Sequence, residues 1–169
     1  MFVEFSKLNG LSRVWIFQST KVIDDITINL LKEDLCIFLE NWKSHQNVFE
    51  SSFVIKYNTF IVVAADESTL VSGCSIDSLV NFIKILEKKY SLFLLDKLNI
   101  KYKIGQEIKT VGLKQFKDIC ENLNLSEKLT VFNNLVKNIS DFKKTEIAGP
   151  GFININLNYI QTTTILTNI

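Results

Sequence analysis

The fold is decided by one stretch, SSFVIKYNTFIVVAADES (residues 51–68). Residues 53–57 alternate between large apolar side chains and other types, as expected for one strand of a sheet. Asn58 and Thr59 follow and are expected to form a two-residue turn. Residues 60–65 are continuously apolar, which predicts a central strand that is covered on both faces. The stretch therefore predicts an antiparallel hairpin at the centre of a sheet.

Three further segments carry a helical pattern. Their apolar side chains recur at spacings of three and four, so that one face of each helix is apolar. The first segment opens at a pair of acidic residues, Asp24 and Asp25, which suits the start of a helix. The predicted helices cover residues 24–42, 76–90 and 113–123.

The remaining strands are short, and one pair flanks a glycine turn. Gly105 at the first position of a two-residue turn suits a type II′ hairpin. These strands are expected at residues 12–19, 99–104, 107–111 and 129–132. The order of elements predicts an α+β fold, in which about three helices pack on a mostly antiparallel sheet.

The chain is expected to contain one domain and a divergent tail. A length of 169 residues suits a single domain, and residues 1–144 carry the patterns above. From residue 145 the composition changes, with AGPG at 148–151 followed by a segment rich in Asn, Ile and Thr. This tail is expected to be either an edge strand or a poorly ordered extension.

Composition and charge favour a cytoplasmic protein that does not bind nucleic acid. The net charge is +1, from 19 basic and 18 acidic residues, so the basic excess of nucleic-acid-binding proteins is missing. Lys101, Lys103 and Lys109 are spread thinly and are expected on solvated faces. The N-terminus lacks a signal-peptide pattern, and no apolar run is long enough for membrane insertion. Three widely spaced cysteines suggest a reduced compartment.

The turn before the second helix is the strongest candidate site. Ser72, Gly73, Cys74 and Ser75 precede the helix predicted from residue 76, where unpaired amides favour an anion or a thiolate. One interpretation is a nucleophilic Cys74, or a pocket for a small anionic ligand that these residues form with Asp77. The other is structural: Ser75 caps the helix, Asp77 lies in its first turn, and Cys74 fills a small gap.

Other candidate residues lie outside this turn. Asp66 and Glu67 end a buried strand, where paired acids can bind a cation or act as acid and base, although acids also commonly begin turns. His45, the single histidine, could act as a base for Cys74. His45 and Arg13 could together orient an acidic substrate. One histidine and no paired-cysteine motif predict no metal site and no cofactor.

Several of these residues also resemble a known family. The segments that carry the resemblance occur in this order: Ser12–Ile16, Trp42 with Ser44-His45, Tyr57-Asn58 with Phe60, Asp66-Glu67-Ser68, the SGCSID block at 72–77, and residues 131–136. The set resembles a small bacterial family, typical of Bacteroidetes, that is often labelled "ABC transporter ATPase". The likeness covers roughly residues 3–142, and family members differ at the tail, where they have a segment containing Trp and charged residues. The family label implies ATP hydrolysis, but the chain has no GxxxxGK[ST] phosphate-binding motif, so ABC-type ATPase activity is not expected.

Two functional hypotheses follow. Because no complete catalytic constellation is present in the sequence, the leading one is a non-enzymatic accessory or interaction protein with a protein partner. The alternative is a small enzyme or anion-binding protein centred on residues 72–77.

Overall fold

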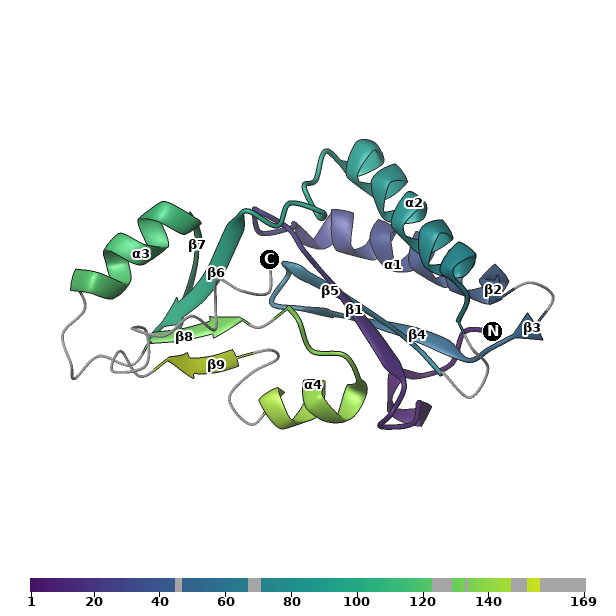
Figure 1. Ribbon diagram of the computed structural model, residues 1–169. Coiled ribbons are helices and arrows are strands. Elements are labelled where there is room, and N and C mark those ends of the chain that lie inside the picture. The colour runs from purple at the N-terminus through teal and green to yellow at the C-terminus, as the bar shows by residue number, and fades with distance from the viewer. Residues whose placement is uncertain (45–46, 67–70, 123–128, 133, 147–151, 156–169) are drawn as a thin grey trace.

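The structure is a computed structural model that describes residues 1–44, 47–66, 71–122, 129–132, 134–146 and 152–155. It has the predicted α+β fold, built from helices and antiparallel sheets (Figure 1). The helices are η1 (Phe5–Lys7), α1 (Asp25–Asn41), α2 (Gly73–Tyr90), α3 (Leu113–Asn122) and α4 (Ile139–Glu146). The strands are β1 (Arg13–Gln18), β2 (Lys43–Ser44), β3 (Asn47–Val48), β4 (Ser51–Lys56), β5 (Phe60–Ala65), β6 (Asn99–Ile104), β7 (Glu107–Gly112), β8 (Leu129–Phe132) and β9 (Phe152–Ile155).

The first sheet has the order β1-β5-β4, with the apolar strand β5 in the middle. Ile61 and Val63 point into a core that they share with α1 and α2, whereas Val62 and Ala64 join a second cluster with α4. Figure 1 shows this layering, with α1 and α2 on one face of the sheet and α4 on the other. Since both faces are covered, β5 is apolar at every position.

The predicted hairpin is confirmed, but its turn lies one residue earlier than expected. Tyr57 and Asn58 both take positive φ angles, and the Thr59 N–H donates to the Lys56 carbonyl at 3.1 Å. Positive φ at both central positions is what a type I′ turn requires, and asparagine tolerates that region well.

The predicted helices are also present, with one shift in a boundary. Asp24 caps α1 by accepting from the Thr27 N–H at 2.9 Å. α2 begins at Gly73, three residues before the predicted start, and its cap is Ser72, whereas the sequence indicated Ser75. Ser72 takes an extended backbone conformation and accepts from the Ser75 N–H, so the helix gains almost one turn.

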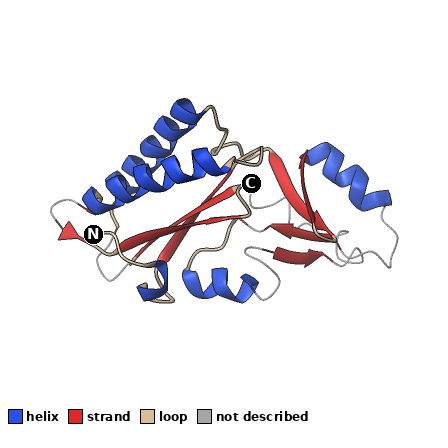
Figure 2. Cartoon of the chain, turned by 180° about the vertical axis from the view of Figure 1, so that it is seen from behind, coloured by secondary structure: helices blue, strands red, loops and turns tan. Residues whose placement is uncertain are grey.

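A second sheet, with the order β7-β6-β8-β9, lies beside the first (Figure 2). α3 packs on one of its faces, where Tyr102, Phe116, Cys120 and Val131 form a small core. Strand β9 pairs only with β8 among the described strands, so residues 152–155 form an edge strand. The rest of the tail beyond Ile155 lies outside the described residues.

Two smaller features complete the fold. Strands β2 and β3 form a short antiparallel pair after α1, next to the start of α2. α4 was not predicted, and Asn138 begins it by accepting from the Asp141 N–H at 2.8 Å. Among the described helices, none combines the length and the apolar character needed to cross a bilayer.

Candidate functional site

The most distinctive surface feature lies along the seam between α1 and α2, which run antiparallel. At one end, Lys89 Nζ donates to both carboxylate oxygens of Asp34 at 2.9 and 2.8 Å, and the Tyr90 hydroxyl donates to the same group at 2.7 Å. At the other end, Trp42 Nε1 donates to the Ser75 carbonyl at 2.9 Å and to Ser78 Oγ at 3.1 Å. Polar contacts therefore hold the two helices together at both ends.

Between these contacts the seam is aromatic. The rings of Phe38 and Phe82 stack with their centroids 4.1 Å apart and an interplanar angle of 4°. Trp42 packs on Phe38 and meets Phe49 edge-on, while only 3% of Trp42 is exposed. Such ring pairs add stability beyond the burial of area alone, so they help to hold the two helices together.

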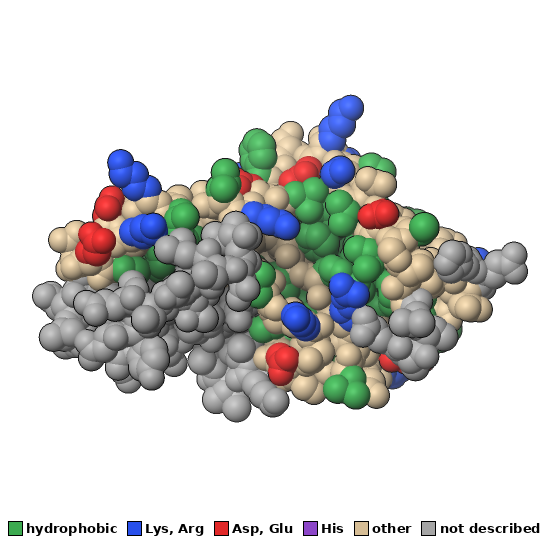
Figure 3. Space-filling model, in the orientation of Figure 1, with side chains coloured by type: hydrophobic (Ala, Val, Ile, Leu, Met, Phe, Trp, Pro, Cys, Tyr) green, Lys and Arg blue, Asp and Glu red, His purple; other side chains and the backbone are tan. Residues whose placement is uncertain are grey.

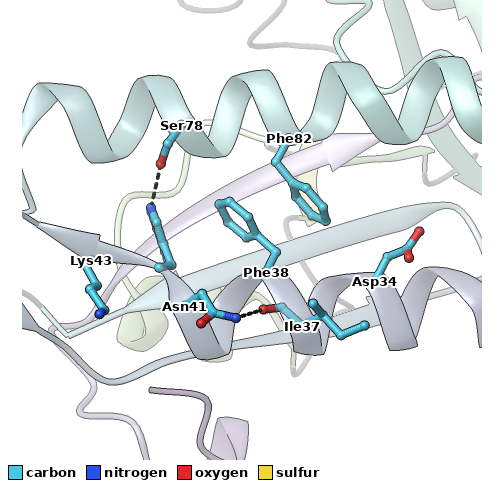
Figure 4. A pocket seen from close by; sticks show the side chains of 8 residues that line it. Asp34, Ile37, Phe38, Asn41, Lys43, Ser78 and Phe82 are labelled. Carbon is cyan, nitrogen blue, oxygen red and sulfur yellow. Dashed lines mark hydrogen bonds between the residues drawn. The ribbon is translucent and has the colours of Figure 1, made fainter.

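An open groove of about 540 Å³ runs over the seam (Figure 4). Phe38 and Phe82 point toward each other from the two helices and form its apolar centre. The remaining lining residues are mostly polar and stand at the ends and along the rim: Asp34, Ile37, Asn41, Trp42, Lys43 and Ser78. Figure 3 shows hydrophobic side chains gathered over α1 and α2 on this face of the molecule.

The electrostatics of the Asp34 end are set by its pairing. Partial burial alone would raise the pKa of the Asp34 carboxyl, but hydrogen bonds from Lys89 and Tyr90 outweigh it and hold the pKa below its ordinary value. The hydrogen bond to Asp34 in turn raises the pKa of Lys89. Both groups are therefore charged at neutral pH, and the pair serves to fix the helices.

The candidate turn at residues 72–77 is held by internal hydrogen bonds. Ser75 Oγ donates to the Lys43 carbonyl at 2.9 Å, and the Ser72 N–H donates to Ser44 Oγ at 3.1 Å. The hydroxyl oxygens of Ser72 and Ser75 also lie 2.9 Å apart. Ser75 is buried, and these hydrogen bonds join the first turn of α2 to strand β2. The Ser75 side chain is therefore not available to a ligand. Gly73, Cys74 and Asp77 are exposed.

The three cysteines differ in their surroundings. Burial raises the pKa of the Cys36 and Cys120 thiols, and nearby glutamates add to the effect. Cys74 is the exposed one, and it lies one helical turn before Ser78 on α2. The structural interpretation is wrong in three details, because Cys74 is exposed and fills no gap, Ser72 rather than Ser75 caps the helix, and Asp77 lies beyond the first turn of α2. The hydroxyls of Ser72 and Ser75 nevertheless have partners within the fold.

The other predicted site residues are only partly brought together. Asp66 follows the end of β5, and its N–H donates to the Glu50 carbonyl at 2.8 Å. Arg13 pairs with Ala65 across the sheet, one residue from Asp66, and its guanidinium lies 5.0 Å from the centroid of the Trp15 ring. His45 and Glu67 lie outside the described residues. Within the described ranges, no group of three metal-binding side chains could hold a metal ion.

Comparisons with known proteins add no assignment. No family model matches the chain, and neither the curated proteins nor the solved structures gave a match. The resemblance to the "ABC transporter ATPase" family therefore stays a prediction.

Two features of this structure were missed by sequence reasoning. The groove combines Phe38 with Phe82, two residues whose contact no local pattern predicts. Phe38 belongs to the predicted apolar stripe of its helix, whereas Phe82 lies outside the stripe predicted for residues 76–90. Lys101 was expected on a solvated face, and this is wrong: it is only 3% exposed, and its Nζ donates to Thr110 Oγ1 at 2.6 Å. Because side chains alternate along β6, Lys101 points away from the Tyr102 core and lies beside Thr110 of the paired strand β7.

Proposed function

We propose that this chain is a non-enzymatic accessory protein that binds a protein partner in the groove between α1 and α2. The observation that carries the proposal is an apolar groove whose two walls are joined by polar contacts at both ends, with exposed aliphatic side chains beside it. Ile37 on α1 is 66% exposed, and Ile85 on α2 is 61% exposed. Leu30 and Ile26 extend the exposed apolar surface along α1.

Contiguous apolar surface of this kind is typical of protein interaction sites. Aromatic side chains at the centre of a groove are the usual anchors of an interface, with polar groups around them. The polar contacts at Asp34 and Trp42 fix the spacing of the helices before a partner arrives. Little ordering is then needed on binding, which favours affinity.

The proposal is tested by affinity capture from an extract of the native cells at physiological salt. The test variant is Ile37→Gln with Ile85→Gln, and the matched control is Leu11→Gln with Leu98→Gln, because Leu11 and Leu98 are also exposed. Wild type and control are expected to retain the same partner, and the test variant is expected to lose it. Equal retention by the test variant, or no retained protein at all, would contradict the proposal.

A further inference from the structure

We infer that the occupant of the α1–α2 groove is an amphipathic helix of the partner, with Lys or Arg residues bordering its apolar stripe on the α1 side. This inference rests on the proposed function and goes further, because it names the secondary structure and the charge of the partner segment.

The apolar surface has a helical layout. Ile26, Leu30 and Ile37 are exposed on α1 at spacings of four and seven residues, so they lie on one face of the helix. From Ile26 to Ile37 this face extends over about 16 Å, at about 1.5 Å per residue. Ile85 stands on the opposite wall, three residues after Phe82. The apolar trough is therefore walled by both helices only from Asp34 to Lys43. Ile26 and Leu30 continue its apolar row along α1 beyond the end of α2, where Lys89 and Tyr90 contact Asp34.

A helix suits this trough better than an extended peptide. The amides and carbonyls in the middle of α1 and α2 are paired within each helix, so the walls offer an extended backbone almost no hydrogen bonds. Extended peptides instead bind to the edges of sheets, where such groups are open. A helix satisfies its own backbone and presents anchors at spacings of three and four that can enter the groove between two helices.

The charge of the partner follows from α1. With its cap, this helix carries five carboxylates, from Asp24, Asp25, Glu33, Asp34 and Glu40, and one lysine, Lys32. Only Asp34 is engaged by a lysine of α2, through its pair with Lys89. Asp24 caps α1 by accepting from the Thr27 N–H, and Asp25 accepts from Asn58 Nδ2. Glu33 and Glu40 are therefore the acids of α1 that remain beside the apolar stripe, and Glu40 also accepts from the Phe2 N–H at 3.0 Å.

The acids border the apolar stripe directly. Glu33 is four residues before Ile37 and Glu40 is three residues after it, and both glutamates are exposed. On the other wall the exposed charges are mostly basic, with Lys84 and Lys88 near Ile85. A complementary partner therefore carries basic residues where it lies over α1 and neutral or acidic residues where it lies over α2. Such charge complementarity governs the choice of partner and the association rate.

The experiment uses two synthetic 18-residue helical peptides as probes. Both carry Leu at positions i, i+4, i+7 and i+11. One has Lys on the flanks of this stripe, and its twin has Glu at the same positions. Binding to the full chain is measured by fluorescence anisotropy at low and at high salt. The Lys peptide is expected to bind at least about tenfold more tightly than its twin, with an affinity that falls as salt rises.

Two variants locate the effect. Glu33→Lys is expected to weaken binding of the Lys peptide about three- to tenfold, as for an exposed charge at an interface rim. The matched control is Glu121→Lys, which reverses an exposed glutamate on α3 and is expected to change nothing. Ile37→Gln with Ile85→Gln is expected to abolish binding of the Lys peptide.

Each other outcome has a definite meaning. If the Glu peptide binds as tightly as the Lys peptide, the inferred charge is wrong. If neither peptide binds while the capture experiment succeeds, the helical occupant is wrong and the proposed function stands. If sedimentation shows a dimer that Ile37→Gln with Ile85→Gln disperses, the occupant is a second copy of this chain and the inference is overturned.

Discussion

The two larger sheets of this protein are both antiparallel, but the first is covered by helices on both faces and the second carries α3 on one face. In the described residues, the core shared by β5, α1 and α2 contains seventeen buried hydrophobic residues. The core between β6 and α3 contains four. On the opposite face of β6, Lys101 is buried against Thr110, whereas the opposite face of β5 carries Val62 and Ala64.

The difference shows how strand composition limits what can cover a sheet. β5 has no polar side chain and can be enclosed by helices on both faces. β6 alternates Ile100 and Tyr102 with Lys101 and Lys103, so that one face carries the Tyr102 core. The lysine face carries only a smaller cluster, in which Ile108 packs against Phe60 and Phe132. That second face is bordered by polar links: Gln18 Nε2 donates to the Asn99 carbonyl, and Asn134 Nδ2 donates to Gln18 Oε1, both at 3.0 Å.

The largest expected effect tests whether the first core dominates stability. Leu31→Ala removes a fully buried side chain of α1 and is expected to lower the free energy of unfolding by about 3–4 kcal/mol, through lost burial and a residual cavity. It is measured by urea denaturation followed by far-UV circular dichroism. Ile26→Ala, at an exposed position of the same helix, is the control and should lie within about 0.5 kcal/mol of wild type. Equal losses in both variants would contradict the comparison.

The second prediction concerns the buried lysine of the other sheet. Burial lowers the pKa of Lys101 from 10.5 to about 8. At neutral pH the buried ammonium group of Lys101 therefore lowers the stability of the folded state. The drop in pKa corresponds to a cost of about 3 kcal/mol at most. Lys101→Met is expected to raise the free energy of unfolding at pH 7 by about 2 kcal/mol, because the apolar side chain needs no charge in that site.

The pH dependence gives the sign of this effect. Between pH 8 and pH 10.5 the folded state has lost the Lys101 proton while the unfolded state keeps it, so this group makes stability rise with pH across that window. The advantage of Lys101→Met over wild type should therefore shrink from pH 7 to pH 10, as measured by urea denaturation at each pH. Lys103→Met, at a half-buried neighbour, is the control. A constant difference between Lys101→Met and wild type would show that Lys101 is not held as a buried charge.

The same contrast explains what the sequence could reveal. The apolar run of β5 and the periods of α1, α2 and α3 are local signals, and they predicted the elements and the fold class. Asn138 also left a local signal for α4, an asparagine three residues before Asp141, which sequence reasoning overlooked. The start of α2 was misplaced because Ser72 and Ser75 are equally good caps when judged by residue type.

The groove and the buried lysine left no such signal. Phe38 and Phe82 are 44 positions apart, and their stacking depends on how two helices dock on one sheet. Lys101 looks like any lysine on an alternating strand, and neither its burial nor its contact with Thr110 across the β6–β7 pair is visible in its own residue type. Site prediction favoured Cys74 because a helix start is visible in sequence, whereas the hydrogen bonds that occupy Ser72 and Ser75 come from β2 and are not.

A third prediction returns to the seam between α1 and α2. Trp42→Phe keeps an aromatic ring but removes the indole N–H that joins α1 to the Ser75 carbonyl and Ser78 Oγ. The expected loss is about 1–2 kcal/mol, because Ser78 Oγ still donates to the Ser75 carbonyl at 2.7 Å and leaves that acceptor satisfied. The loss is measured by thermal unfolding. A loss as large as that of Leu31→Ala would mean that polar contacts, rather than the core, fix the helix pair.

The smallest effects decide between the two interpretations of residues 72–77. Ser72→Ala removes the hydroxyl that accepts from the Ser75 N–H and should cost about 1 kcal/mol, as for other helix caps. Cys74→Ala, two residues away and exposed, should change stability by less than about 0.5 kcal/mol and should leave the captured partner unchanged. Both are measured by urea denaturation, with capture as the second readout. If Cys74→Ala instead abolished capture while stability held, the functional interpretation of this turn would be restored, and the groove would no longer be sufficient to explain binding.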